Sequence, residues 1–74
     1  MKNIELMKQE LIEAGFKKLT LRKALEESPD NEDIKNEWFL ACHVENKAFL
    51  ALQEATSLTD TAEFYSENVL KHFI

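Results

Sequence analysis

Hydrophobic residues along this chain recur every three or four positions, which is the spacing of one face of an α-helix. The first such stripe has four members, Ile4, Met7, Leu11 and Ala14. Asn3 precedes it and is a suitable N-cap, because its side chain can accept a hydrogen bond from the first turn. Gly15 follows the stripe and is typical of a residue that ends a helix in the left-handed conformation. The pattern therefore predicts a first helix that follows Asn3 and ends at Gly15.

A short second helix is predicted over residues 21–28. Thr20 is a suitable N-cap, and Leu19 and Ala24 flank it at the positions of a hydrophobic staple. Four basic residues gather at the start of this helix, namely Lys17, Lys18, Arg22 and Lys23. They oppose the helix dipole, as do Glu26 and Glu27 at its end. Either pairs four residues apart, Arg22 with Glu26 and Lys23 with Glu27, offset this cost, or the basic patch serves a partner.

The longest predicted helix covers residues 31–55, where no glycine or proline interrupts the pattern. Ser28-Pro29-Asp30-Asn31 has the composition of a helix start. The main apolar stripe consists of Ile34, Trp38, Ala41, Ala48, Leu52 and Ala55, flanked by Val44, Ala51, Cys42 and Phe49. We expect this side of the helix to face the core.

Phe39 and Leu50 project from the opposite side of the same helix, with His43 and Asn46 between them. Two arrangements account for a helix with apolar residues on both sides. Either the helix is central and a neighbour packs on each side, or these four residues form an exposed seam. An exposed seam with an aromatic and an aliphatic anchor is typical of helix-mediated protein binding.

The last helix is predicted over residues 61–73, after a loop at 56–59. Asp60 and Glu63 resemble a capping box at its start. Its inward stripe is Ala62, Tyr65, Val69 and Phe73, whereas Phe64 projects away and is a further candidate anchor for a partner.

Glu45 interrupts the core stripe of the longest helix, between Ala41 and Ala48. A buried carboxylate without a partner is costly, so three explanations remain open. A bend or an edge position lets it reach water, or it pairs with Arg22 or a lysine, or it is a functional acid.

Composition excludes several other fold classes. The 74 residues contain one Gly and one Pro and no hairpin signature, and 45% of them are hydrophobic. We predict one all-α domain over residues 1–74, a small bundle of three longer helices and one short helix. The single cysteine allows no internal disulfide, and no apolar run is long enough for a membrane span or signal peptide. The expected location is the cytoplasm.

The net charge of −5 is unevenly distributed. An acidic patch of six carboxylates, Glu26, Glu27, Asp30, Glu32, Asp33 and Glu37, lies within twelve residues. It is consistent with a solvated surface, or with an inhibitor that mimics nucleic acid and blocks a basic nucleic-acid-binding protein. Direct binding of nucleic acid is not expected, because acidic residues open the helix that would have to enter the groove.

No motif for catalysis or metal binding is present. The candidate metal ligands are Cys42, His43 and His72. Cys42 and His43 are adjacent and diverge by about 100° on a helix, so they cannot both reach one metal ion without distortion. We expect no enzyme activity, no metal or other cofactor and no small-molecule substrate. The sequence favours a small regulatory or interaction protein that docks on a protein partner, and a homodimer is the expected state because the core is small.

Overall fold

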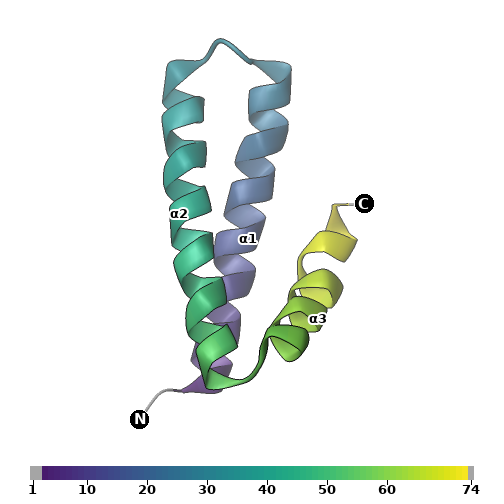
Figure 1. Cartoon of the computed structure of the whole chain (residues 1–74). Coiled ribbons are helices and arrows are strands. Elements are labelled where there is room, and N and C mark those ends of the chain that lie inside the picture. The colour runs from purple at the N-terminus through teal and green to yellow at the C-terminus, as the bar shows by residue number, and fades with distance from the viewer. Residues whose placement is uncertain (1–2, 74) are drawn as a thin grey trace.

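The computed structural model describes residues 3–73, which form a hairpin of two long helices with a shorter helix packed against one side (Figure 1). Helix α1 spans Ile4–Glu27 and α2 spans Glu32–Ala55, each with 24 residues. Helix α3 spans Leu58–Asn68 and is followed by a 3-10 turn at Leu70–His72. The described residues contain no strand, and the predicted all-α class is confirmed.

Each α-helix begins with a side-chain cap. The Asn3 side chain accepts a hydrogen bond from the Leu6 amide and that of Asn31 accepts one from the Ile34 amide, each at 3.2 Å. For α3 the cap is Ser57, whose hydroxyl accepts a hydrogen bond from the Asp60 amide at 3.0 Å.

The predicted start of the last helix is therefore wrong by one turn. Asp60 lies inside the first turn of α3, where its charge complements the positive end of the helix, and the cap is three residues earlier. The α-helix also ends at Asn68 and continues only as the 3-10 turn, so the predicted range of 61–73 shifts toward the N-terminus. The long helix predicted over residues 31–55 is confirmed as α2.

The predicted helix break at Gly15 is also wrong, because α1 runs through it without interruption. Gly15 does not adopt the left-handed conformation of a helix terminus. A Cβ at this position would lie 2.7 Å from Val69 Cγ1 and 3.2 Å from Tyr65 Cε2. The glycine thus permits α3 to approach the backbone of α1 closely.

The short helix predicted over residues 21–28 is consequently the last part of α1. Thr20 is exposed in the interior of this helix and caps nothing, and no staple forms between Leu19 and Ala24 because no helix begins there. The four basic residues do not lie at a helix N-terminus, so their predicted unfavourable interaction with the helix dipole does not arise. Glu26 and Glu27 still occupy the negative end of α1.

One of the two predicted charge pairs is present. Arg22 Nε lies 3.8 Å from Glu26 Oε1, with both side chains about two-thirds exposed, at 64% and 68%. Lys23 instead lies over the ring of Phe73, with its Nζ 5.6 Å from the ring centroid.

The core lies where the three helices meet, and it is small. Leu11, Leu52 and Val69 are almost completely buried, as is Thr61. Among the described residues, three further apolar side chains are buried, namely Ala14, Leu19 and Ala41. Full burial of one leucine contributes about 2 kcal/mol, so this core alone confers a modest stability.

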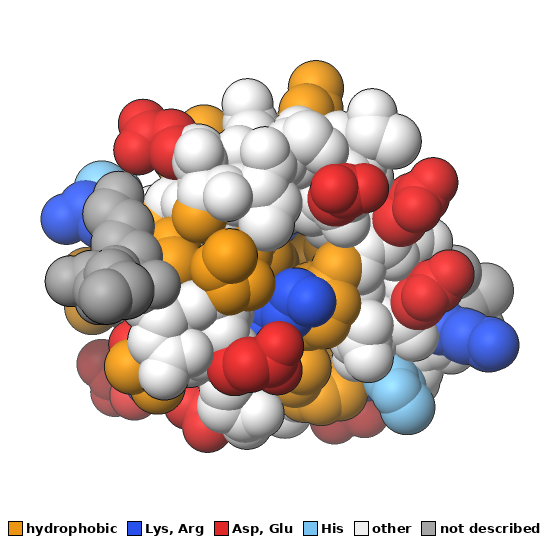
Figure 2. Space-filling view, turned by 90° about the horizontal axis from the view of Figure 1, so that it is seen from below, with side chains coloured by type: hydrophobic (Ala, Val, Ile, Leu, Met, Phe, Trp, Pro, Cys, Tyr) orange, Lys and Arg blue, Asp and Glu red, His pale blue; other side chains and the backbone are white. Residues whose placement is uncertain are grey.

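The overall shape is flat and open. The backbone measures 41 × 25 × 16 Å, and its radius of gyration is 13.1 Å, against about 11 Å for a compact chain of this length. In Figure 1, α3 covers only the half of the hairpin nearer to the α2–α3 connection, and the half that carries the α1–α2 turn stands as two helices. Viewed from the end at which α1 begins, hydrophobic side chains reach the surface around a basic side chain (Figure 2).

Candidate interaction surface

Helix α2 exposes more large apolar side chains than it buries. Its buried residues are Ala41 and Leu52. Its exposed large hydrophobic residues, with their exposed fractions, are Phe39 (58%), Leu40 (67%), Val44 (57%) and Leu50 (49%). The reason is that α1 and α3 both contact α2 from the side that carries Ala41 and Leu52, which leaves the opposite side open.

All four residues of the predicted seam are exposed, namely Phe39, His43, Asn46 and Leu50. Of the two predicted arrangements, the one in which a neighbour packs on each side of α2 is not found among residues 3–73. The Phe39 ring lies beside that of the preceding residue, Trp38, with the two ring centroids 5.3 Å apart.

Sequence reasoning missed two residues of this surface. Val44 was assigned to the flank of the core stripe, and that assignment is wrong, since more than half of the side chain is exposed. Leu40 belonged to neither stripe, although its spacing of four residues from Val44 places the two side chains together. We call the complete exposed surface the outer face of α2; it consists of Phe39, Leu40, His43, Val44, Asn46 and Leu50.

A groove of about 550 Å³ lies beside the outer face, between α1 and α2. Its floor is made of short side chains, those of Ala14, Ala48 and Ala51, with Val44 at its edge. Four charged residues form its rim, Glu10, Glu13, Lys17 and Lys47. A second hollow extends it past Leu40 toward Glu37. The lining residues come from α1 and α2, whereas α3 contacts α1 through Gly15 on another side.

Phe64 does not join this surface. Its side chain is half-buried, and Lys8 Nζ lies 5.4 Å from its ring centroid. The Asn68 side chain donates a hydrogen bond of 2.9 Å to the Phe64 carbonyl. The prediction of Phe64 as an outward anchor is therefore wrong, because α1 lies close enough to cover its ring.

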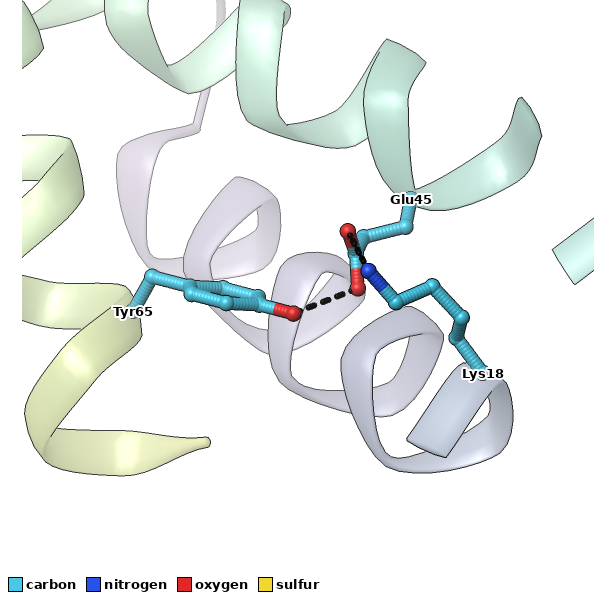
Figure 3. A network of polar contacts seen from close by, with 3 residues as sticks. All are labelled: Lys18, Glu45 and Tyr65. Carbon is cyan, nitrogen blue, oxygen red and sulfur yellow. Dashed lines mark hydrogen bonds and ion pairs between the residues drawn. The ribbon is translucent and has the colours of Figure 1, made fainter. Parts of the chain in front are cut away.

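Glu45 joins the three helices through both carboxylate oxygens (Figure 3). Lys18 Nζ on α1 donates to Oε1 at 2.8 Å, and the Tyr65 hydroxyl on α3 donates to Oε2 at 2.6 Å. The Glu45 side chain is only 13% exposed, so these charge-assisted bonds act where water competes weakly. Of the explanations left open for Glu45, the structure shows the ion pair, and the partner is Lys18 rather than Arg22.

The environment of Tyr65 favours its neutral form. Burial raises the pKa of the Tyr65 hydroxyl well above its usual range, and the hydrogen bond to the nearby Glu45 carboxylate raises it further. The ring of Tyr65 also packs edge-on against Phe49, with centroids 6.0 Å apart. This group of residues therefore fixes the position of α3 against the hairpin.

The two predicted charged patches have different outcomes. All six residues of the acidic patch, Glu26, Glu27, Asp30, Glu32, Asp33 and Glu37, are exposed around the turn between α1 and α2. The basic patch is divided, since Lys17, Arg22 and Lys23 are exposed while Lys18 turns inward to Glu45. The acidic patch thus remains a single surface and the basic patch does not.

Cys42 is half-buried on α2. Within the part of the chain that the structure describes, no group of three His, Cys, Asp or Glu side chains is placed to hold a metal ion. Among the same residues, no helix combines the length and the apolar character that crossing a membrane requires.

Comparisons of the chain with protein-family models, with curated proteins and with solved structures find no match in any of the three. The outer face of α2 and the groove beside it are the features of this fold that point to a function.

Proposed function

We propose that this protein is a small, non-catalytic interaction protein that docks on another protein through the outer face of α2. The observation that carries the proposal is the exposure of Phe39, Leu40, Val44 and Leu50 on one helix. Apolar residues scattered singly on a surface are ordinary, but four large ones exposed within twelve residues of one helix are typical of a binding site. Binding would bury these side chains and recover about 25 cal/mol for each Å² removed from water.

The chemistry of the outer face suits a helical docking surface. Phe39 and Leu50 can act as apolar anchors, and His43 and Asn46 between them supply polar groups that fix the position of a partner. Helix α2 is itself held in place by Glu45, which pairs with Lys18 on α1. A rigid helix loses little conformational entropy on binding, which favours affinity.

The alternative, an acidic inhibitor that mimics nucleic acid, stays a prediction. Its support is the exposed acidic patch at one end of the hairpin. Two of the six carboxylates, Glu32 and Asp33, lie in the first turn of α2, where the helix dipole itself favours acidic residues. The apolar residues of the outer face have no comparable local role, which is why we place docking through α2 first.

Site-specific photo-crosslinking in the cell of origin tests the proposal. A photoreactive phenylalanine analogue is placed at Phe39 or at Leu50, and a matched control carries it at Thr20, an exposed position on α1. We expect a discrete protein adduct from the two α2 positions and none from Thr20. Equal labelling at all three positions, or no adduct from α2, would refute the proposal.

A stability measurement separates an interface role from a core role. Phe39→Ser and Leu50→Ser should each lower the free energy of unfolding by only about 1 kcal/mol, because about half of each side chain is already exposed. The matched variant Leu52→Ser replaces a fully buried residue of the same helix and should unfold the protein or nearly so.

A further inference from the structure

We infer that a second copy of this chain binds the Leu40 and Val44 side of the outer face, with α2 antiparallel against α2 and the two helices crossing near residue 42. The inference rests on the proposed function and identifies its partner. It follows from the arrangement of four exposed residues, Glu37, Leu40, Val44 and Lys47.

These residues are placed symmetrically about position 42. Leu40 is two residues before it and Val44 two after, while Glu37 is five before and Lys47 five after. An antiparallel pair of helices that crosses at position 42 sets Leu40 of one copy against Val44 of the other. The same arrangement sets Glu37 against Lys47, and each contact occurs twice because the interface has two-fold symmetry.

The four residues share one stripe of the helix. Their spacings of three, four and three residues keep them on the same side of α2. Leu40 and Val44 form an apolar centre, with an acidic residue at one end of the stripe and a basic residue at the other. A parallel pair would bring Glu37 against Glu37 and Lys47 against Lys47, so the charges select the antiparallel arrangement.

The groove beside the stripe provides the space for close packing. Its floor of Ala14, Ala48 and Ala51 has short side chains, so the helix of a second copy can approach to the usual packing distance of about 8–10 Å. Helix α3 does not occupy this side. Two hairpins stacked here would form a four-helix bundle in which the two α2 helices run antiparallel.

The exposed surface area of the chain is large enough to include an interface with a second copy. The chain exposes 5374 Å², whereas a compact monomer of its mass exposes about 4,700 Å². The excess of about 700 Å² is close to the roughly 800 Å² that each partner buries in a standard protein interface. A second copy that buries this excess would therefore give the assembly the exposed surface area expected of a compact protein.

A charge exchange tests the inference, with sedimentation equilibrium of the full chain as the measurement. The wild-type chain should be a dimer. Glu37→Lys and Lys47→Glu should each raise the dimer dissociation constant about tenfold or more, because each change turns two attractive contacts into repulsive ones. The double variant restores opposite charges and should return the constant to within about threefold of wild type.

A matched control and a folding check accompany this series. Glu27→Lys makes the same charge change on α1, at an exposed position of the acidic patch, and should leave the dissociation constant unchanged within about threefold. Both sites of exchange are exposed, so circular dichroism should show unchanged helix content in every variant.

The outcomes separate this inference from the proposed function. A wild-type chain that sediments as a monomer at millimolar concentration overturns the inference, and so does a dimer that the double variant fails to restore. If the chain is monomeric while the photoreactive residue at Phe39 captures a different protein, the outer face is still a docking site. If the chain is monomeric and no adduct forms, both proposals are refuted.

Discussion

Replacement of Gly15 by alanine should destabilise this protein, although alanine is the better helix former. Gly15 lies in the middle of α1, where an exposed glycine-to-alanine change would stabilise the helix by about 1 kcal/mol. The new Cβ, however, would lie 2.7 Å from Val69 Cγ1 and 3.2 Å from Tyr65 Cε2. Carbon atoms pack best at about 3.5–4.0 Å, so α3 or its side chains must move.

The magnitude depends on how easily Val69 can yield. Its side chain is completely buried and β-branched, so it has few alternative rotamers and no space to enter. Overpacking of this kind costs about 1–3 kcal/mol, which exceeds the gain in helix propensity. We expect a net loss of about 1 kcal/mol, which for a domain of this size lowers the melting temperature by about 4–8 °C.

Thermal and urea unfolding followed by circular dichroism provide the assay. Thr20→Ala is the matched control, because it adds helix propensity at an exposed position of the same helix and should be stabilising by a few tenths of a kcal/mol. In a Val69→Ala background the nearest obstructing atom is absent, so Gly15→Ala should there be neutral or stabilising. If Gly15→Ala stabilises the otherwise unchanged protein as Thr20→Ala does, the close approach of α3 to α1 is not real.

Two further outcomes concern the contacts of Glu45, and a third concerns the exposed ion pair between Arg22 and Glu26. Lys18→Met should lower the free energy of unfolding by about 1–3 kcal/mol, because it leaves a largely buried carboxylate with only the Tyr65 hydroxyl as partner. Arg22→Ala should change it by less than about 0.5 kcal/mol, because that ion pair is exposed; equal losses from the two variants in urea would contradict this ranking. Tyr65 is the sole tyrosine, so near-ultraviolet absorbance reports its ionisation directly. Its raised pKa means that the fold binds the phenol proton more tightly than the unfolded chain does. The resulting contribution to the free energy of unfolding is complete below about pH 10 and is lost as the pH rises further. Phenolate should therefore appear only as the protein unfolds. Ionisation of Tyr65 near pH 10 in the folded state would refute this prediction.

The sequence by itself determined the all-α class, the start of α1 and the limits of α2, but not the continuity of α1 through Gly15 or the limits of α3. Asn3 caps α1 as its side chain predicts, and the uninterrupted pattern over residues 31–55 corresponds to α2. The outward direction of Phe39 and Leu50 also follows from the sequence, because the angle between two residues on one helix depends only on their separation. These features are local, so local rules are sufficient to predict them.

The tertiary structure decided what each of these faces contacts. Gly15 has the same local signature whether it ends a helix or admits a neighbour, and only the position of Val69 distinguishes the two. Glu45 needed a partner, but Lys18 and Tyr65 lie 27 and 20 residues away along the chain. Val44 is at the edge of an apolar stripe, and its exposure depends on which side α1 and α3 occupy. Periodicity shows that a face is apolar, whereas the packing of distant segments determines whether that face becomes core or surface.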